Sequence, residues 1–535
     1  MMKNEFQNIR DMLEKRAEEF PEKIFAYWKE QKITYKEFND NASRIAGYMQ
    51  ELVKKGDKVG IYCLNKIEYI YVTFGLGKIG VVSSHINTFA RGDIIAYYIN
   101  KTHCKYVFVD ASLLDSYMEV RKKVNVSGEI YLADKSVIES IPTMDRHVIC
   151  FDDLMTMKPE YSKIDILKGD PFSIMFTSGT TGMPKAVVQS NYYWISFAEH
   201  WVREFRYTPD DNVMVMMPLF HVNPWAGIFS ALLAGASFTL LERFSASTIW
   251  EDAVKYGVTS IVGHAAHVYY LPRRPESEFR PEHKVRSAWI APVNHEIARI
   301  FRERFKIKDV ITGYGSTEAG VLTTFMFVPS GVKPPKGGVF GGYVRDDIEC
   351  KVVNERDEEL PPLEVGEIVL RPKKPYTIFT EYYGDPERTL NAFRNLWFHT
   401  GDLGYFDENG VLYFVGRKAE CIRVRGEFIP VEYIEEAIKS YEKVEDAIVV
   451  GVPSGLGPFD EDVKAYIVPK KGVEVKPEEI LDYLKTRLSR TYLPRYIEFV
   501  DEIERQPPVG KVPRYKYKER GVGKAWDRVK AGYKV

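Results

Sequence analysis

The feature that most constrains the fold is an alternation of short β-branched segments with amphipathic segments over roughly the first 330 residues. This alternation is typical of α/β proteins in which helices cover both faces of parallel, doubly wound sheets. The chain has 535 residues, which is enough for about three compact units. Strands are expected at 58–63, 105–110, 172–176, 212–217, 238–241 and 259–262, and helices at 67–79 and about 93–101.

The pattern changes after about residue 330. Residues 330–342 are rich in Gly and Pro and predict a loop. Turn-separated strands are then expected at 348–353, 366–371 and 411–415, which indicates a β-rich part such as a distorted barrel. Helices at 431–440 and 476–488 and strands at 447–452 and 463–468 follow. The sequence therefore predicts a large N-terminal domain at 1–417 and a small, mobile α+β domain at 418–535.

The overall charge and the cysteines exclude several classes of partner and site. The 74 Lys and Arg residues nearly balance the 75 Asp and Glu residues, so no field favours nucleic acid or an anionic membrane. The five cysteines are odd in number and form no CxxC pair. A disulfide framework or a structural zinc site is therefore not expected, and a reducing cytoplasm fits best. The sequence leaves the oligomeric state open, with a homo-oligomer as one arrangement.

No secretion signal or membrane span is expected. The N-terminal segment is charged and amphipathic, with one helical face made of Phe6, Ile9, Met12 and Leu13, and it lacks the apolar core of a signal peptide. Residues 212–241 contain no charged side chain, but Pro218 and His221 divide them into two short apolar runs. A buried strand, a loop and a core helix explain this stretch better than a transmembrane helix.

The strongest chemical signal is the segment FTSGTTGMPK at 176–185. Gly179 and Gly182 allow a tight turn that brings backbone N–H groups to an anion, and Lys185 adds a positive charge. The spacing differs from the GxxxxGK[ST] pattern, so an ordinary NTPase phosphate loop is not indicated. The hydroxyls that can donate to phosphate oxygens belong to Thr177, Ser178, Thr180 and Thr181.

Further motifs follow this loop in a fixed order, and together they resemble one superfamily. They are GYGSTE at 313–318, HTGDL at 399–403, FVGR at 414–417, IRVRGEFIP at 422–430 and QPPVGK at 506–511. The sequence from about residue 24 to 515 resembles the adenylate-forming superfamily of acyl- and aryl-CoA ligases, peptide-synthetase adenylation domains and beetle luciferase. Residues 237–262 are similar to crotonobetaine/carnitine-CoA ligases and related short- or medium-chain ligases.

This resemblance implies an ATP-dependent acid–CoA ligase. The acid and ATP would give an acyl-adenylate and pyrophosphate, and coenzyme A would then displace AMP. The partners implied are a small-molecule carboxylic acid, ATP, Mg²⁺ and coenzyme A. Because AMP is a far better leaving group than oxide, adenylation makes the acyl group transferable to a thiol.

The resemblance also implies roles for the nucleotide-binding residues. Tyr314, between Gly313 and Gly315, offers a flat face to adenine, and Thr317 can bond the α-phosphate. Glu318 is a hard oxygen ligand suited to Mg²⁺, the alternative being a carboxylate at a helix N-terminus.

Other positions are assigned in the same way. Asp402 would accept hydrogen bonds from the ribose hydroxyls, supported by Arg417, and Ala291 would lie beside the adenine. Lys511, on the mobile domain, would stabilise the α-phosphate during attack by the acid. Arg425 and Gly426 would line the coenzyme A tunnel in the second step. The expected catalytic residues are Thr177, His221, Glu318 and Lys511.

The segment PLFHVNPW at 218–225 suggests the acid site, with His221 closing over the acid. It contains no Asp to hold an amino group, which argues against an amino acid substrate. Trp225 would shorten the pocket and favour a short, medium or small polar acid. Trp225, Trp289 or Tyr314 could surround a quaternary ammonium. The alternatives are a different acyl acceptor, a non-catalytic nucleotide-binding regulator and a plain ATPase, which the loop spacing disfavours.

Overall fold

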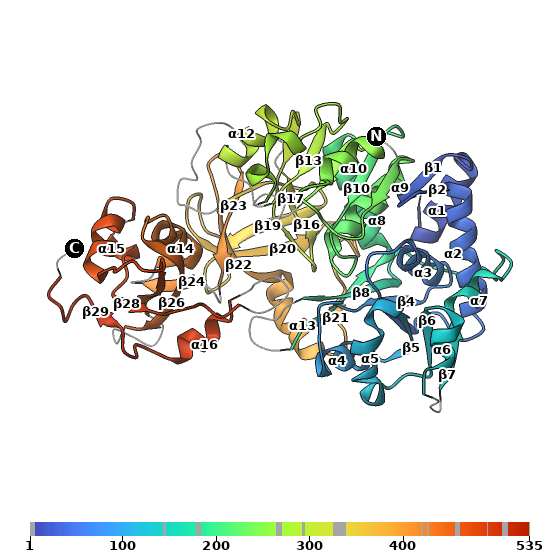
Figure 1. The fold of residues 1–535 in the computed structure, drawn as a ribbon, viewed down its shortest axis with the longest axis horizontal. Coiled ribbons are helices and arrows are strands. Elements are labelled where there is room, and N and C mark those ends of the chain that lie inside the picture. Colours follow the sequence, from blue (N-terminus) through green and yellow to red (C-terminus); the bar gives the residue numbers. More distant parts are fainter. Residues whose placement is uncertain are drawn as a thin grey trace. The chain divides into compact units, whose positions relative to one another are not determined.

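The computed structural model of the protein describes most of the chain (Figure 1). The chain divides into two compact units, the first made of Met1–Val332, Phe340–Glu349 and Leu370–Phe398, and the second of Lys333–Val339, Cys350–Val369 and His399–Val535. The predicted boundary after residue 417 stays a prediction. The described residues are 6–142, 146–177, 183–263, 270–291, 295–324, 339–418, 421–424, 427–454, 461–488, 490–505 and 512–533.

The first unit contains an eight-stranded sheet in the order β21-β9-β8-β4-β3-β5-β6-β7. Strands β3 to β8 run parallel where they pair, whereas β9 is antiparallel to β8 and β21 is antiparallel to β9. The strands are β3 (Lys58–Tyr62), β4 (Val82–His85), β5 (Cys104–Asp110), β6 (Gly128–Leu132), β7 (His147–Cys150), β8 (Pro171–Thr177), β9 (Lys185–Ser190) and β21 (Glu381–Tyr382).

A second sheet of this unit has seven strands in the order β14-β13-β12-β10-β11-β1-β2. All of its pairs are parallel except β1 with β2. The strands are β1 (Ile24–Trp28), β2 (Gln31–Thr34), β10 (Asn212–Val215), β11 (Ser237–Leu240), β12 (Ser260–Val262), β13 (Ser287–Trp289) and β14 (Asp309–Ile311). The predicted parallel α/β architecture is confirmed.

Apolar helices build the core of the first unit against these sheets. Helix α9 is apolar on all sides and its residues are almost all buried, as a core helix requires. The aromatic side chains of α8 and α9 interlock there, with Trp194 and Phe229 ring centroids 5.1 Å apart. The longer helices are α1 (Ile9–Glu19), α2 (Tyr35–Met49), α3 (Ile67–Lys78), α4 (Asp93–Lys101), α8 (Asn191–Phe205), α9 (Val222–Ala234) and α12 (His295–Glu303).

Short elements complete the first unit. The short helices are α5 (Leu114–Met118), α6 (Lys135–Glu139), α7 (Phe151–Met155), α10 (Ile249–Lys255) and α13 (Pro386–Ala392). The 3-10 turns are η1 (Ala111–Leu113), η2 (Arg121–Lys123), η3 (Leu271–Arg273), η4 (Glu276–Glu278) and η5 (Arg394–Leu396). The short strands are β15 (Gly315–Ser316), β16 (Gly320–Val321), β17 (Thr323–Thr324) and β18 (Val339–Val344).

The second unit combines a β-rich part with an α+β part; both parts were predicted, but the β-rich part was assigned to the N-terminal domain. Its strands β23, β22, β20 and β19 are successive neighbours in one sheet, and β26-β27-β28-β29 form another. They are β19 (Ile348–Val353), β20 (Gly366–Pro372), β22 (Phe398–Phe406), β23 (Leu412–Arg417), β26 (Val444–Pro453), β27 (Glu461–Pro469), β28 (Tyr496–Phe499) and β29 (Trp526–Asp527). The remaining elements are β24 (Cys421–Val424), β25 (Glu427–Pro430), α14 (Val431–Lys439), α15 (Pro477–Lys485), η6 (Arg490–Tyr492) and α16 (Arg514–Glu519).

The structure differs from the sequence prediction at the loop 330–342 and agrees with it at the apolar stretch 212–241. The predicted loop at 330–342 was wrong at its end, because β18 begins at Val339 and pairs with β17 through Tyr343 and Thr324. The apolar stretch 212–241 is confirmed as strand, loop and core helix. Among the residues that the structure describes, no helix is long and apolar enough to cross a membrane.

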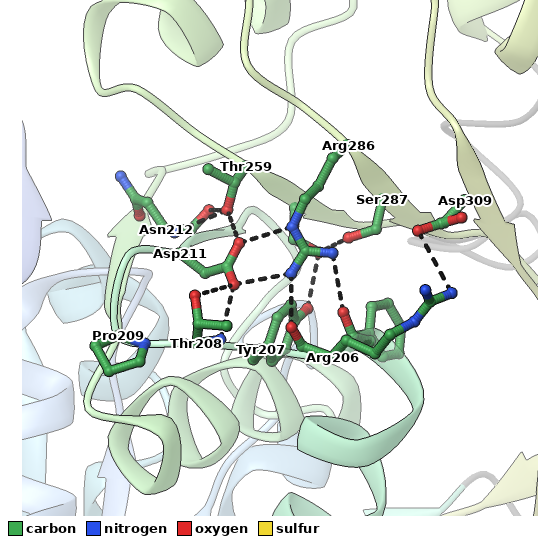
Figure 2. A network of polar contacts seen from close by, with 12 residues as sticks. Arg206, Tyr207, Thr208, Pro209, Asp211, Asn212, Thr259, Arg286, Ser287 and Asp309 are labelled. Carbon is green, nitrogen blue, oxygen red and sulfur yellow. Dashed lines mark hydrogen bonds and ion pairs between the residues drawn. The ribbon is translucent and has the colours of Figure 1, made fainter.

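A polar network fastens the amino ends of the strands in the seven-stranded sheet (Figure 2). Arg286, just before β13, donates to Asp211 Oδ1 and Oδ2 at 3.0 and 2.8 Å. Thr259, just before β12, donates to the same carboxylate at 2.6 Å. The network therefore stabilises the end of the sheet opposite to the carboxyl ends, where ligands bind in open α/β sheets.

Candidate functional site

The predicted site residues of the first unit lie after the carboxyl ends of strands. Thr177 ends β8, His221 follows β10, Ala291 follows β13 and Gly313 follows β14. In open α/β sheets this edge is where ligands bind, because the loops there are free to carry functional groups.

Thr177 and Lys185 face each other across a hairpin. Strands β8 and β9 pair antiparallel, with Thr177 opposite Lys185 in the register. The tip of the predicted phosphate loop, Ser178 to Gly182, lies outside the described residues, and with it the predicted ligands Ser178, Gly179, Thr180 and Thr181. The hairpin thus places a hydroxyl and an ammonium at the two ends of this loop.

Glu318 lies in the turn of a second hairpin, between β15 and β16. Its backbone oxygen accepts from the N–H of Phe379 at 2.7 Å, and its Oε1 accepts from the hydroxyl of Tyr382 at 3.0 Å. Only 9% of Glu318 is exposed. The alternative of a carboxylate at a helix N-terminus is wrong, because no helix begins there.

Tyr382 connects Glu318 to the phosphate hairpin. The Lys185 ammonium lies over the Tyr382 ring, 4.8 Å from its centroid. Strand β21 carries Tyr382 and pairs with β9, with Tyr382 opposite Val187. The structure therefore brings together Lys185 and Glu318, which belong to separate motifs in the sequence.

The backbone of Thr317 is fixed from the other side. Its carbonyl oxygen accepts from Gln189 Nε2 at 3.1 Å and from the Tyr193 hydroxyl at 3.0 Å. Burial raises the pKa of Tyr193 above its ordinary value, and the charge of Glu318 raises it further, so the hydroxyl stays a donor. Thr317 and Glu318 are thus held by groups from β9, α8 and β21.

Two glycines of the GYGSTE motif are required by close backbone approach. A Cβ on Gly313 would lie 2.0 Å from the carbonyl oxygen of Thr323, and one on Gly315 would lie 2.3 Å from that of Gly320. Tyr314 lies between them and is 8% exposed, with its N–H donating to Thr323 Oγ1 at 3.0 Å. The stacking of adenine on Tyr314 stays a prediction.

The segment around His221 is anchored by a distant asparagine. Asn65, in the loop after β3, donates to the carbonyl oxygen of Met217 at 2.9 Å and accepts from the N–H of Leu219 at 2.9 Å. His221 is the N-cap residue of α9, and its ring centroid is 4.3 Å from that of Phe220. The predicted closure of His221 over an acid is not tested by these contacts.

The two tryptophans expected at the acid site are core residues. Trp225 is 1% exposed, donates to the carbonyl oxygen of Leu219 at 2.6 Å and packs on Tyr69 and His85. Burial lowers the pKa of His85 to about 3, so this neighbour is neutral. Trp289 is 3% exposed. Neither indole presents an exposed face to a quaternary ammonium, and the same role for Tyr314 stays a prediction.

In the second unit, Asp402 and Arg417 lie opposite each other on β22 and β23. Arg417 Nε is 3.6 Å from Asp402 Oδ1. Asp402 is buried in a strand, whereas an isolated Gly-Asp pair favours a turn. The predicted residues Arg425, Gly426 and Lys511 lie outside the described residues.

The side chains that the structure describes can be compared with the ligands that Mg²⁺ requires. Among the described residues, no three His, Cys, Asp or Glu side chains gather as a metal cage. Mg²⁺ at nucleotides needs only one or two protein carboxylates, because phosphate oxygens and water supply the other ligands. A single buried carboxylate with an orienting hydroxyl, as at Glu318, fits this mode.

Sequence reasoning missed the residues that hold the site together. Tyr382 belongs to no quoted motif, and its neighbours 381–383 give no signal beyond aromatic residues near a β-rich part. Asn65 lies in a short polar interruption between an apolar strand and an apolar helix, which is a weak signal for a bridging side chain.

Family models match both parts of the chain. Residues 13–383 match the AMP-binding enzyme family, and residues 433–508 match the AMP-binding enzyme C-terminal domain. The chain belongs to the AMP-binding enzyme family. The resemblance inferred from the motifs is thereby confirmed, and the predicted boundary at 417 falls between the two matched ranges.

Relatives within and around this family are similar over nearly the whole chain. A crotonobetaine/carnitine–CoA ligase of Salmonella paratyphi A is 28% identical over 518 residues, covering 93% of this chain and 96% of that protein. The O-succinylbenzoate coenzyme A synthetase (MenE) of Bacillus subtilis in complex with AMP superposes with a TM-score of 0.80 at 24% identity, covering 97% and 99% of the chains. The structure of the anthranilate CoA ligase AuaEII in complex with anthranoyl-AMP superposes with a TM-score of 0.79 at 21% sequence identity. The match covers 96% of this chain and 97% of that chain.

Proposed function

We propose that this AMP-binding enzyme is an AMP-forming acid–CoA ligase. The observation that carries the proposal is the link from Lys185 through Tyr382 to Glu318, which joins the phosphate hairpin to a buried carboxylate. The acid and ATP give an acyl-adenylate and pyrophosphate, and coenzyme A then gives an acyl-CoA and AMP. The relatives described above are coenzyme A ligases or synthetases, which supports a thiol acceptor.

In the first step the protein positions the carboxylate and neutralises developing charge. The phosphate loop from Thr177 to Lys185 binds the phosphates of ATP, and Thr317 bonds the α-phosphate. Glu318 holds Mg²⁺, which shields the phosphate charges when bound. Most of the rate enhancement of such a reaction comes from positioning and electrostatics.

The second unit supplies the remaining groups. Asp402 accepts hydrogen bonds from the ribose hydroxyls, and Arg417 supports it from the neighbouring strand. Lys511 stabilises the α-phosphate in the first step. A rotation of the mobile domain then brings Arg425 and Gly426 to the coenzyme A tunnel.

The acid is a short, medium or small polar carboxylic acid. Its site lies at the carboxyl end of β10, where His221 closes over it. The segment 218–225 holds no carboxylate that could bind an amino group, and Trp225 and His85 beneath it are neutral. A simple neutral acyl chain therefore suits this site better than an amino acid.

The protein acts in the cytoplasm, in this proposal. The support is the odd, scattered set of cysteines, of which Cys63, Cys104 and Cys150 are free and buried. Burial raises the pKa of the Cys63 thiol well above its ordinary value, so this thiol is unreactive.

The identity of the nucleotide products tests the proposal. The purified protein is incubated with ATP, Mg²⁺, coenzyme A and a panel of short, hydroxylated, betaine, aryl and medium-chain acids. AMP and pyrophosphate in equal amounts, with an acyl-CoA, are expected. ADP and phosphate would indicate a plain ATPase, and adenylation without thioester would indicate another acceptor. ATP binding without turnover of any acid would favour a non-catalytic regulator.

A further inference from the structure

We propose that Tyr382 is a positioning residue that keeps the carboxylate of Glu318 and the ammonium of Lys185 apart and aims each at the nucleotide. This inference rests on the proposed function, because it assigns Glu318 to Mg²⁺ and Lys185 to a phosphate. Tyr382 lies outside the motifs quoted above, and its contacts with Glu318 and Lys185 are visible only in the fold.

One phenol serves both charged groups. Its hydroxyl donates to Glu318 Oε1 at 3.0 Å, and its ring face receives the Lys185 ammonium 4.8 Å from the centroid. A lysine over an aromatic ring is attracted by the ring quadrupole, while a carboxylate is attracted by the hydroxyl proton. The same side chain therefore satisfies a cation and an anion through two different parts.

This arrangement opposes a direct salt bridge. A lysine and a glutamate in one partly desolvated site attract each other strongly, and a close pair would neutralise both groups. Held by Tyr382, the carboxylate of Glu318 stays available to a divalent cation and the ammonium of Lys185 stays available to an anion. Second-sphere partners of metal-binding carboxylates orient them in this way.

The position of Tyr382 is fixed by the backbone. The N–H of Thr380 donates to the carbonyl oxygen of Val188 at 3.0 Å, and the N–H of Tyr383 donates to that of Ala186 at 2.8 Å. These bonds tie the segment to β9, which begins at Lys185. The same segment also bonds the backbone of Glu318 through Phe379.

Tyr382 is buried, and its own backbone is bonded as well. Tyr382 is 3% exposed, and its backbone N–H donates to Thr389 Oγ1 at 3.0 Å. Both the side chain and the backbone of Tyr382 therefore have fixed partners within the fold.

The variants Tyr382→Phe and Tyr382→Leu separate the two contacts. Phenylalanine keeps the ring for Lys185 and removes the hydroxyl from Glu318, whereas leucine removes both. The matched control is Tyr383→Phe, which changes the adjacent tyrosine, whose ring lies under Lys58 instead, 4.8 Å from the Lys58 ammonium. Thermal unfolding of each variant reports whether it is folded.

The main readout is ATP binding, measured by calorimetry over a range of Mg²⁺ concentrations and with no metal. For Tyr382→Phe we expect roughly tenfold more Mg²⁺ for half-maximal enhancement of ATP binding, with metal-free ATP affinity within about twofold of the wild type. For Tyr382→Leu we expect weaker metal-free binding as well. Tyr383→Phe should match the wild type in both.

The inference would be overturned if ATP binding by Tyr382→Phe depended on Mg²⁺ concentration in the same way as in the wild type. It would also be overturned if Tyr383→Phe needed as much additional Mg²⁺ as Tyr382→Phe. If Tyr382→Leu does not fold, Tyr382→Phe alone decides. The proposed function fails separately, through wild-type protein that binds no ATP or adenylates no acid. If the wild type binds ATP and adenylates an acid, but the Mg²⁺ dependence of Tyr382→Phe is unchanged, only the role of Tyr382 is refuted.

Discussion

Asn65 accepts a hydrogen bond from the backbone N–H of Leu219 at 2.9 Å, although the two residues are 154 positions apart. The same amide donates to the carbonyl oxygens of Met217 and Leu241 at 2.9 and 3.1 Å. Both the amide nitrogen and the amide oxygen of this buried side chain therefore bond to backbone groups. The loop after β3 is thereby tied to the loops after β10 and β11 at the edge where the acid is proposed to bind.

Removing this tie should affect acid binding more than ATP binding. Asn65→Ala frees the backbone that leads into His221, and we expect the KM for the acid to rise about tenfold, with the KM for ATP within about twofold. The matched control is Asn212→Ala, at the amino end of β10, which also loses side-chain bonds to Tyr256 and Thr239. Steady-state kinetics measures both constants. An equal rise of the two KM values in Asn65→Ala would contradict this account.

The two half-reactions should separate in variants of the second unit. Lys511→Ala should abolish adenylation but largely spare thioester formation from a preformed acyl-adenylate, because the charge of Lys511 is needed while pyrophosphate leaves. Gly426→Ile should impair the coenzyme A step more, because a side chain would fill the tunnel. Each half-reaction is assayed alone. Parallel losses in both assays would remove these roles.

The network of Figure 2 should stabilise the protein without serving catalysis. Asp211 is 4% exposed in its side chain and is held by Arg286, so Arg286→Met leaves a buried carboxylate with fewer partners. We expect a loss of about 3 kcal/mol in the free energy of unfolding. The exposed pair of Arg203 with Asp346 is the comparison, and Arg203→Met should cost below about 1 kcal/mol. Urea denaturation measures both, and equal costs would refute the assignment.

The ion pair of Glu14 with the buried Lys78 should make the stability of the protein depend on pH in the acidic range. Burial alone would raise the pKa of Glu14, but Lys78, Lys163 and Tyr161 outweigh it and lower the pKa to about 2. Because the folded pKa is depressed, the stabilisation is complete above the ordinary value of 4.5 and is lost as the pH falls through about 2. The free energy of unfolding should therefore fall between about pH 5 and pH 2. Glu14→Ala should flatten this slope, and an unchanged slope would contradict the prediction.

A side chain at Gly313 should not fit beside the backbone of Thr323. The Cβ of Gly313→Ala would lie 2.0 Å from the carbonyl oxygen of Thr323, which is backbone and cannot move aside cheaply. We expect loss of adenylation and a lower unfolding temperature. Gly60→Ala, whose Cβ would meet only side-chain atoms at 3.3 Å or more, is the control and should remain active. Full activity of Gly313→Ala would show that the hairpin is not needed as it stands.

The sequence predicted the parallel sheets well because local patterns encode them. The strand before Cys63, the helix beginning at Ile67 and the strand ending at Asp110 were found from apolar runs and turn residues alone. The strand beginning at Val339 was missed because its glycines resemble a loop, and only pairing with β17 makes them a strand. Local composition does not contain such long-range pairing.

The candidate site was predicted in part for a similar reason. The motifs identified Lys185 and Glu318, since the chemistry of phosphates and Mg²⁺ needs particular residue types. They did not identify Tyr382 or Asn65, whose roles come from contacts across many residues of sequence. Trp225 was misjudged because an aromatic residue near a motif fits a pocket wall as well as a core.

The central claim is that this protein adenylates a carboxylic acid. Acid-dependent exchange of labelled pyrophosphate into ATP, with Mg²⁺ and without coenzyme A, tests it most directly. We predict exchange with at least one short, medium or small polar acid, and conversion to acyl-CoA and AMP when coenzyme A is added. A folded, ATP-binding protein that shows no exchange with any acid of the panel would contradict the claim.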